Sequence, residues 1–269
     1  MKRDRAASDP AAPQRTEPLL SFDDRATLLV IAVAAAVAFV VGFFFPPPDS
    51  PRVGQADAAD VRAWVESNSV ALHAAATALV LAAVGFLVVA AGLSALVRRH
   101  LRGSMLSELL VGSAVVVAVL LVLDTAAQTM SLILPGLVDT NLADVSDPVV
   151  VIWLAVGGFT HFLGDLQMAF IAVLLASGTM AARRLRLVNR WLGYLGLVVA
   201  GCSALGTLGI TLSIDALYPL WFVGIYGFYF SLLVLAASAA FAWRRVHRTP
   251  DDAVRPSLGS SSAAASPVS

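Results

Sequence analysis

The chain has 269 residues, of which 58% are hydrophobic and 13% charged, with a formal net charge of zero. This balance lies far outside that of soluble globular domains, so the excess of apolar side chains predicts contact with lipid. The single cysteine, Cys202, excludes a disulfide framework and a cysteine-based metal site. The sequence contains no Gly-rich phosphate loop, no HExxH or GxSxG pattern and no Cys/His metal spacing. We therefore expect no enzyme, no cofactor, no metal and no nucleic-acid partner.

Six apolar runs are long enough to cross a membrane, which takes roughly 20 residues in a helix. They cover residues 26–45, 69–97, 104–134, 148–181, 191–213 and 217–243. The runs predict an all-α bundle of about six transmembrane helices in one domain, residues 23–246. The flanking segments 1–22 and 247–269 are rich in Ala, Pro, Ser and charge, and are too poor in large apolar groups to order themselves. We expect both tails to be disordered.

Basic residues are distributed unevenly between the two sides of the predicted bundle. Of the 18 lysines and arginines, 16 fall in the tails, the second–third connection and the fourth–fifth connection, which all lie on one side. Only Arg52 and Arg62 fall on the other side. Because basic residues near helix ends are retained in the cytoplasm, this pattern predicts that both termini are cytoplasmic. We expect a multi-pass protein of a bacterial cytoplasmic (plasma) membrane.

The first connection, 46–68, lies on the side with few basic residues. Ala58, Val61, Trp64 and Val65 share one helical face within it, opposite acidic side chains, which predicts a short helix lying on the membrane interface. Ser67 and Asn68 follow, and both residue types are good N-caps. We expect them to begin the second transmembrane helix.

Two connections on the basic side resemble each other. The sequence Ala90-Ala91-Gly92 leads to Arg98-Arg99, and Ala176-Ser177-Gly178 leads to Arg183-Arg184. The likeness is either a remnant of duplication or the ordinary pattern of small residues near a helix end followed by positive charge.

Polar residues inside the predicted helices are the candidates for a functional site. Asp124 lies in the third helix, while His161 and Asp165 lie four residues apart, on one face of the fourth. Gln128 extends the polar stripe of Asp124. A carboxylate at mid-membrane costs about 3 kcal/mol on insertion scales, which favours a use for it. The four residues form either an intramembrane polar relay, with His161 as the group that titrates near neutral pH, or a helix-packing site.

Aromatic side chains are concentrated in the sixth predicted helix, at Tyr226, Phe228, Tyr229 and Phe230. Lipid contact and core packing are the ordinary reasons for such a concentration. The alternative is that these rings line a groove for a lipidic or apolar ligand.

The stretch 189–197 runs from Asn189 to Leu197 with the sequence NRWLGYLGL and enters the fifth predicted helix after an arginine-rich turn. Together with the six-helix layout, it resembles an element of bacterial multi-pass membrane proteins grouped as domains of unknown function. The resemblance implies no substrate and no catalytic residues.

Two hypotheses of function follow from the sequence. The first is a non-enzymatic membrane component that binds a lipid or a partner, such as another membrane protein or a second copy of the chain. The second is a small proton-coupled transporter or proton-sensing protein that uses Asp124, His161 and Asp165. Dry, paired carboxylates favour the first hypothesis, and a water-accessible cavity that joins Asp124 to His161 favours the second.

Overall fold

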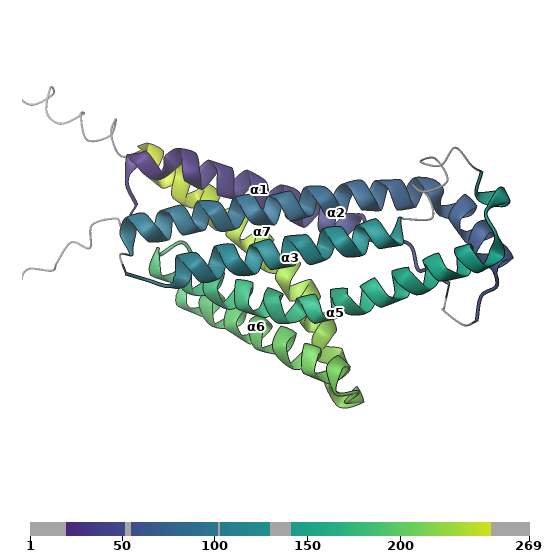
Figure 1. Cartoon of the computed structure of the whole chain (residues 1–269). Helices are drawn as coiled ribbons and strands as arrows, with labels where there is room; N and C mark the ends of the chain where they lie inside the picture. The colour runs from purple at the N-terminus through teal and green to yellow at the C-terminus, as the bar shows by residue number, and fades with distance from the viewer. Residues whose placement is uncertain (1–19, 52–54, 102, 130–140, 249–269) are drawn as a thin grey trace, which may run out of the picture.

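The structure is a computed structural model that describes residues 20–51, 55–101, 103–129 and 141–248, with the backbone alone at 128, 157–163, 166, 247 and 248. These residues form long α-helices and short 3-10 turns, with no strand in the described ranges (Figure 1). The α-helices are α1 (Arg25–Phe44), α2 (Ala58–His100), α3 (Leu106–Gln128), α5 (Asp147–Arg184), α6 (Arg190–Thr211) and α7 (Tyr218–Arg248). The predicted all-α bundle is confirmed.

Several of these helices are apolar enough to cross a membrane, which indicates a membrane protein. Five candidate spans meet the requirement of length and composition, and they fall on α1, α2, α3, α6 and α7. The helix α5 contains the fourth predicted run, 148–181, and only the backbone of its middle is described. A count of six spanning helices therefore remains a prediction.

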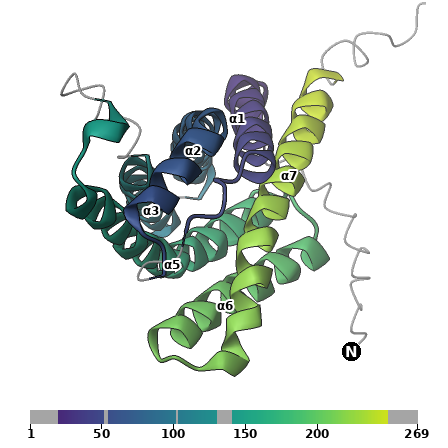
Figure 2. The same ribbon diagram turned by 90° about the vertical axis from the view of Figure 1, so that its right-hand side faces the viewer.

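The helices pack in an order that places α7 across the bundle. Neighbouring pairs are α1 with α2, α2 with α3, α3 with α5, α5 with α6, and α6 with α7, and α7 also packs against α1. Seen along the bundle, α7 runs diagonally from α1 to α6 (Figure 2). The main core contains Ile31, Phe86, Leu93 and Met168, all nearly fully buried.

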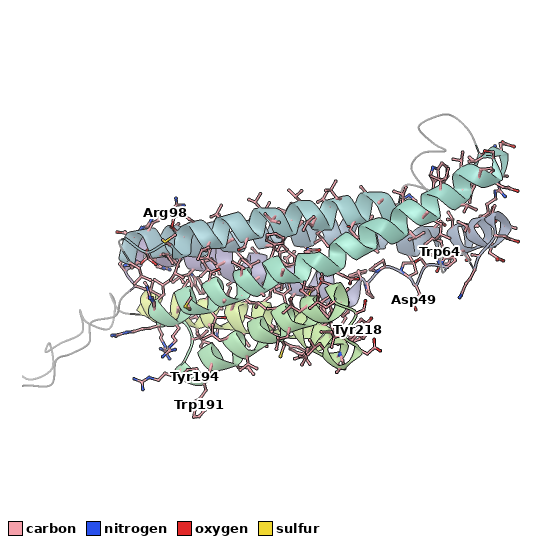
Figure 3. The ribbon with its side chains drawn as sticks, turned by 60° about the horizontal axis from the view of Figure 1, so that its bottom comes forward. Asp49, Trp64, Arg98, Trp191, Tyr194 and Tyr218 are labelled. Carbon is pink, nitrogen blue, oxygen red and sulfur yellow. The ribbon has the colours of Figure 1, made fainter. Side chains whose placement is uncertain are left out.

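The arginines of the helix ends gather at one end of the bundle, which we call the arginine-rich end. It holds the start of α1, the α2–α3 connection, the α5–α6 connection and the end of α7. Figure 3 shows Arg98, Trp191 and Tyr194 toward this end, with Trp64 and Asp49 at the opposite one. Tyr218 lies where α6 meets α7.

The prediction of a separate interfacial helix before the second transmembrane helix is wrong. One continuous helix, α2, runs for 43 residues from Ala58, and Asp57 caps it by accepting a hydrogen bond from the backbone N–H of Asp60 at 2.9 Å. Ser67 and Asn68 are not caps, because they lie inside α2 and their side chains donate to the carbonyl of Trp64. At 1.5 Å per residue α2 is about 65 Å long, roughly twice the hydrocarbon thickness of a bilayer.

The first turns of α2 pack against protein instead of lying on an interface. Val61 and Val65 are buried against Val150 of α5, so the predicted apolar face exists but has a different partner. Arg62 forms an ion pair with Asp147 at 2.7 Å and donates to the carbonyl of Val145 at 2.6 Å. These contacts join α2 and α5 in a small lobe at the end of the bundle opposite the arginine-rich end.

The predicted tails 1–22 and 247–269 fall outside the described residues, apart from 20–22 and 247–248. The last residues of the third predicted run, 130–134, lie outside them as well.

Candidate functional site

Asp124 lies at the interface between α3 and α5, as the relay hypothesis requires. A Cβ atom placed on Gly164 of α5 would be 3.5 Å from Oδ2 of Asp124 and 3.7 Å from its Cγ. The missing side chain of Gly164 thus leaves room for the carboxylate. The structure brings Asp124 against the turn of α5 that contains Asp165, which follows Gly164 directly.

For the other residues of the predicted polar site, the structure gives the helix on which each lies, and for Asp165 also the burial of its side chain. His161 and Gln128 lie within α5 and α3, but their side chains are outside the described part of the structure. Asp165 is half-buried. The structure thus brings Asp124 against α5 at Gly164 and leaves the relay itself a prediction.

A buried polar contact that the sequence analysis missed joins the same two helices. Gln167 of α5 is 7% exposed, and its Nε2 donates to the carbonyl of Val117 in α3 at 2.9 Å. Gln167 lies three residues beyond Gly164, on the same face of α5, and finding its contact required knowing that α3 covers this face. Gln167 fixes the register of α3 on α5.

A second missed feature is a buried carboxylate at the arginine-rich end. Asp24, at the start of α1, is fully buried and accepts from Nη1 of Arg99 at 2.6 Å. The Nε2 of His100 lies 2.8 Å from its other oxygen, which also accepts from the backbone N–H of Ser21 at 2.9 Å. This cluster ties the start of α1 to the end of α2, about 75 residues later in the chain.

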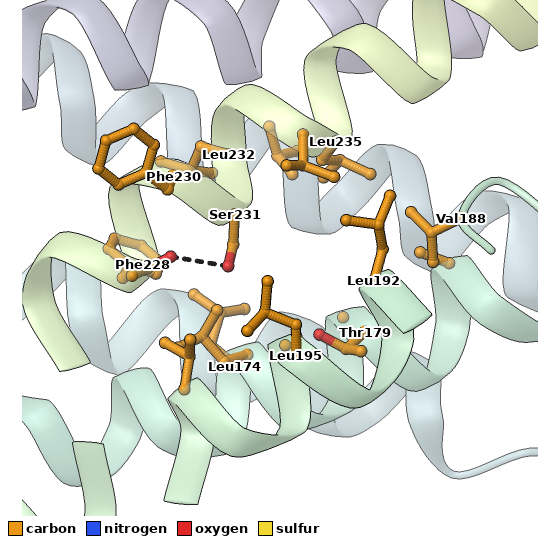
Figure 4. Close-up of a pocket in the computed structure, with 18 of the residues that line it drawn as sticks. Leu174, Thr179, Val188, Leu192, Leu195, Phe228, Phe230, Ser231, Leu232 and Leu235 are labelled. Carbon is orange, nitrogen blue, oxygen red and sulfur yellow. Dashed lines mark hydrogen bonds between the residues drawn. The ribbon is translucent and has the colours of Figure 1, made fainter. Parts of the chain in front are cut away.

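A large apolar pocket lies between α5, α6 and α7, with α2 behind it (Figure 4). Its volume is about 460 Å³, within the range of ligand pockets in proteins. Leu174 and Gly178 of α5, Leu195 of α6, and Phe228 and Leu232 of α7 are among the residues that line it. The aromatic residues Tyr226, Phe228 and Phe230 of the sixth predicted helix all border this space, whereas Tyr229 packs toward α1 against Gly42.

The pocket exists because α6 and α7 touch at one end and separate toward the other. Glycines allow the close approach: a Cβ on Gly206 would be 2.7 Å from the backbone of Trp221, and one on Gly227 would be 2.5 Å from Val199. Past these contacts α7 continues on its diagonal course toward α1, while α6 stays beside α5 (Figure 1). No helix in the described part of the chain fills the wedge between them.

The pocket wall is nearly all hydrocarbon, and part of it is open to the outside of the bundle. Leu195, Tyr226 and Phe230 line the pocket and are 58%, 52% and 52% exposed. The hydroxyl of Ser231 points into it but already donates to the carbonyl of Gly227 at 2.7 Å. An apolar molecule therefore fits this surface better than a polar one.

Two arginines lie close in the chain to the residues that line the arginine-rich end of the pocket. Val188 and Leu192 line that end of the pocket, and Arg186 and Arg190 each lie two residues from one of them. The arginine side chains are exposed. Nearby, the guanidinium of Arg183 lies 5.0 Å from the ring centre of Tyr194.

Known proteins give no guidance on these features. Comparison of the chain with protein-family models, with curated proteins and with solved structures finds no match. The pocket and the α3–α5 interface are therefore the two features from which a function can be inferred.

Proposed function

We propose that this chain is a non-enzymatic, multi-pass membrane protein that binds the hydrocarbon chain of a lipid between α5, α6 and α7. The single observation that carries the proposal is the apolar pocket of about 460 Å³, open along its side through exposed apolar residues. Its wall is nearly all hydrocarbon: the side-chain polar groups that line it are the hydroxyls of Thr179, Tyr226 and Ser231, and that of Ser231 is already bonded within α7. In this proposal the arginine-rich end faces the cytoplasm of a bacterium.

The length and depth of the pocket match one leaflet of a bilayer. The lining extends from Leu174 to Ala182 along α5, about 12 Å, and from Val223 to Leu235 along α7, about 18 Å, at 1.5 Å per residue. One leaflet contributes about 15 Å of hydrocarbon. A lipid chain that enters from the arginine-rich end would end near mid-membrane, where α6 and α7 close together.

Filling the pocket tests the proposal. Gly178→Leu adds a side chain where the nearest atom to a new Cβ is a Leu110 methyl at 3.6 Å, so the larger side chain has room to enter the pocket. Native mass spectrometry of the delipidated full chain, titrated with phosphatidylcholine, measures lipid binding. We expect Gly178→Leu to reduce the bound fraction at least about tenfold, because the leucine occupies the volume of the lipid chain.

Gly201→Leu is the matched control. Gly201 is an exposed glycine of α6 with no atom within 4 Å of a new Cβ, so the same substitution leaves the pocket unchanged. The proposal fails if the parent and both variants bind lipid equally.

A second candidate function is a proton path at the α3–α5 interface, favoured by the position of the Asp124 carboxylate against Gly164. If Asp124 serves proton transfer, Asp124→Asn should abolish proton flux in proteoliposomes while the melting temperature stays equal or rises, because functional polar groups cost stability. Parallel measurements on His161→Gln and Asp165→Asn complete the test. Clearly lower melting of the three variants, with no flux in the parent, would assign these residues to helix packing.

A further inference from the structure

We infer that the lipid in the pocket is anionic, with its headgroup held by Arg186 and Arg190 at the arginine-rich end. This inference rests on the proposed function, since it names the class of lipid that the same pocket takes. The occupant has a hydrocarbon chain along α5, α6 and α7 and a phosphate group at the α5–α6 connection.

The charge around the end of the pocket calls for an anion. Four arginines lie between the end of α5 and the start of α6, namely Arg183, Arg184, Arg186 and Arg190, and the sequence has no acidic residue between Asp165 and Asp215. All four arginines are exposed, and none forms an ion pair with a described residue. The positive charge at this end of the pocket is therefore not neutralised by the described part of the chain.

Arg186 and Arg190 lie at the level along the bundle at which a lipid in the pocket would have its headgroup. Val188 and Leu192 line the end of the pocket, and Arg186 and Arg190 flank them in the chain. Trp191, 82% exposed, and Tyr194 lie beside them, as aromatic rings do at headgroup depth. A chain in the apolar pocket would thus carry its headgroup to the level of the guanidinium groups.

Arg183 has a different role from Arg186 and Arg190. Its aliphatic stem packs on α6, with Cδ 3.2 Å from the position of a Cβ on Gly193, and its guanidinium lies over Tyr194. Arg183 therefore helps to hold α5 on α6. We restrict the headgroup contact to Arg186 and Arg190.

The experiment compares phosphatidylglycerol with phosphatidylcholine of identical chains, each added to the delipidated full-length protein and measured by native mass spectrometry. A basic residue near an anionic lipid surface strengthens binding about fivefold, so two of them predict a preference for phosphatidylglycerol of about 30-fold. We expect Arg186→Gln/Arg190→Gln to lose this preference and keep its binding of phosphatidylcholine. Arg186→Lys/Arg190→Lys should retain most of it.

Arg98→Gln is the control, because Arg98 is exposed at the same end of the bundle and does not line this pocket. It should keep the preference of the parent. Equal affinity of the parent for the two lipids would overturn the inference and leave the proposed function standing. A preference that survives Arg186→Gln/Arg190→Gln would also overturn it, whereas insensitivity of all lipid binding to Gly178→Leu would overturn the proposed function itself.

Discussion

The α2–α3 and α5–α6 connections have closely similar sequences in different surroundings. The helix before each connection ends with a triplet of small residues closed by a glycine, Gly92 or Gly178, and then an arginine pair. A Cβ on Gly92 would be 2.6 Å from Ile31 of α1, whereas a Cβ on Gly178 would meet only a Leu110 methyl at 3.6 Å. The first glycine is covered by a helix, and the second faces the pocket.

The charges differ in the same way. Arg99 of the first connection forms an ion pair with the buried Asp24, which α1 supplies. Arg186 and Arg190 of the second connection have no such carboxylate among the described residues. Beside α2, α1 thus occupies the kind of space that stays open beside α5: Ile31 supplies an apolar side chain, and Asp24, the N-cap of α1, supplies a counter-charge. A lipid with a hydrocarbon chain and an anionic headgroup would supply the same two groups to α5.

The greatest difference in stability is expected between leucine substitutions at Gly92 and at Gly178. Gly92→Leu should lower the free energy of unfolding by about 3 kcal/mol, because the new side chain collides with Ile31 in a packed interface. Gly178→Leu should change it by less than about 1 kcal/mol, because the side chain enters open space. Denaturant unfolding of the two variants in detergent measures the difference. Equal losses would mean that both sites are packed alike.

The next effect concerns the buried carboxylate. Asp24→Ala should lower the free energy of unfolding by about 2 kcal/mol, since Arg99, His100 and the N–H of Ser21 lose their common acceptor. The half-exposed Arg99 can turn to water, which keeps the loss below that of a fully buried pair. Asp23→Ala is the control, because Asp23 is exposed. If both variants unfold at the same denaturant concentration, the cluster does not stabilise the α1–α2 contact.

The smallest difference in stability is expected between the variants Arg99→Gln and Arg186→Gln. Arg99→Gln should lower the free energy of unfolding by about 1 kcal/mol through loss of the ion pair with Asp24. Arg186→Gln should change it by no more than about 0.5 kcal/mol in lipid-free detergent, because the side chain is exposed and has no carboxylate partner in the described structure. Denaturant titration of each variant checks this. A larger loss for Arg186→Gln than for Arg99→Gln would reverse the assignment of roles.

Hydropathy alone predicted where most helices lie, because a membrane helix needs a long apolar run and each run stands between charged or proline-rich segments. It failed at the start of α2, where the acidic residues Asp57 and Asp60 resemble an interfacial loop. Those residues form the N-terminal cap of the helix, and the apolar face beyond them is buried by α5. Local sequence does not state which distant helix will cover a face.

The candidate site was predicted in part for the same reason. The spacing of Asp124, His161 and Asp165 identified the polar faces, and the structure places Asp124 against the α5 turn that contains Asp165. The pair of Asp24 and Arg99 was missed because the two residues are 75 positions apart. The aromatic residues of α7 allowed the prediction of a groove as one alternative. Whether a groove forms depends on the angle at which α6 and α7 diverge after their glycine contacts, and this angle cannot be predicted from the sequence of one helix.

Photolabelling tests the central claim most directly. A phosphatidylglycerol that contains a diazirine near the end of its chain is bound to the full-length protein, irradiated, and mapped by mass spectrometry. We expect adducts concentrated at the mid-membrane end of the pocket, within 174–178, 195–199 and 223–228, lost in Gly178→Leu and retained in Gly201→Leu. Adducts spread equally over the exposed apolar faces of α1 and α3, and unchanged in Gly178→Leu, would contradict the account of a lipid held between α5, α6 and α7.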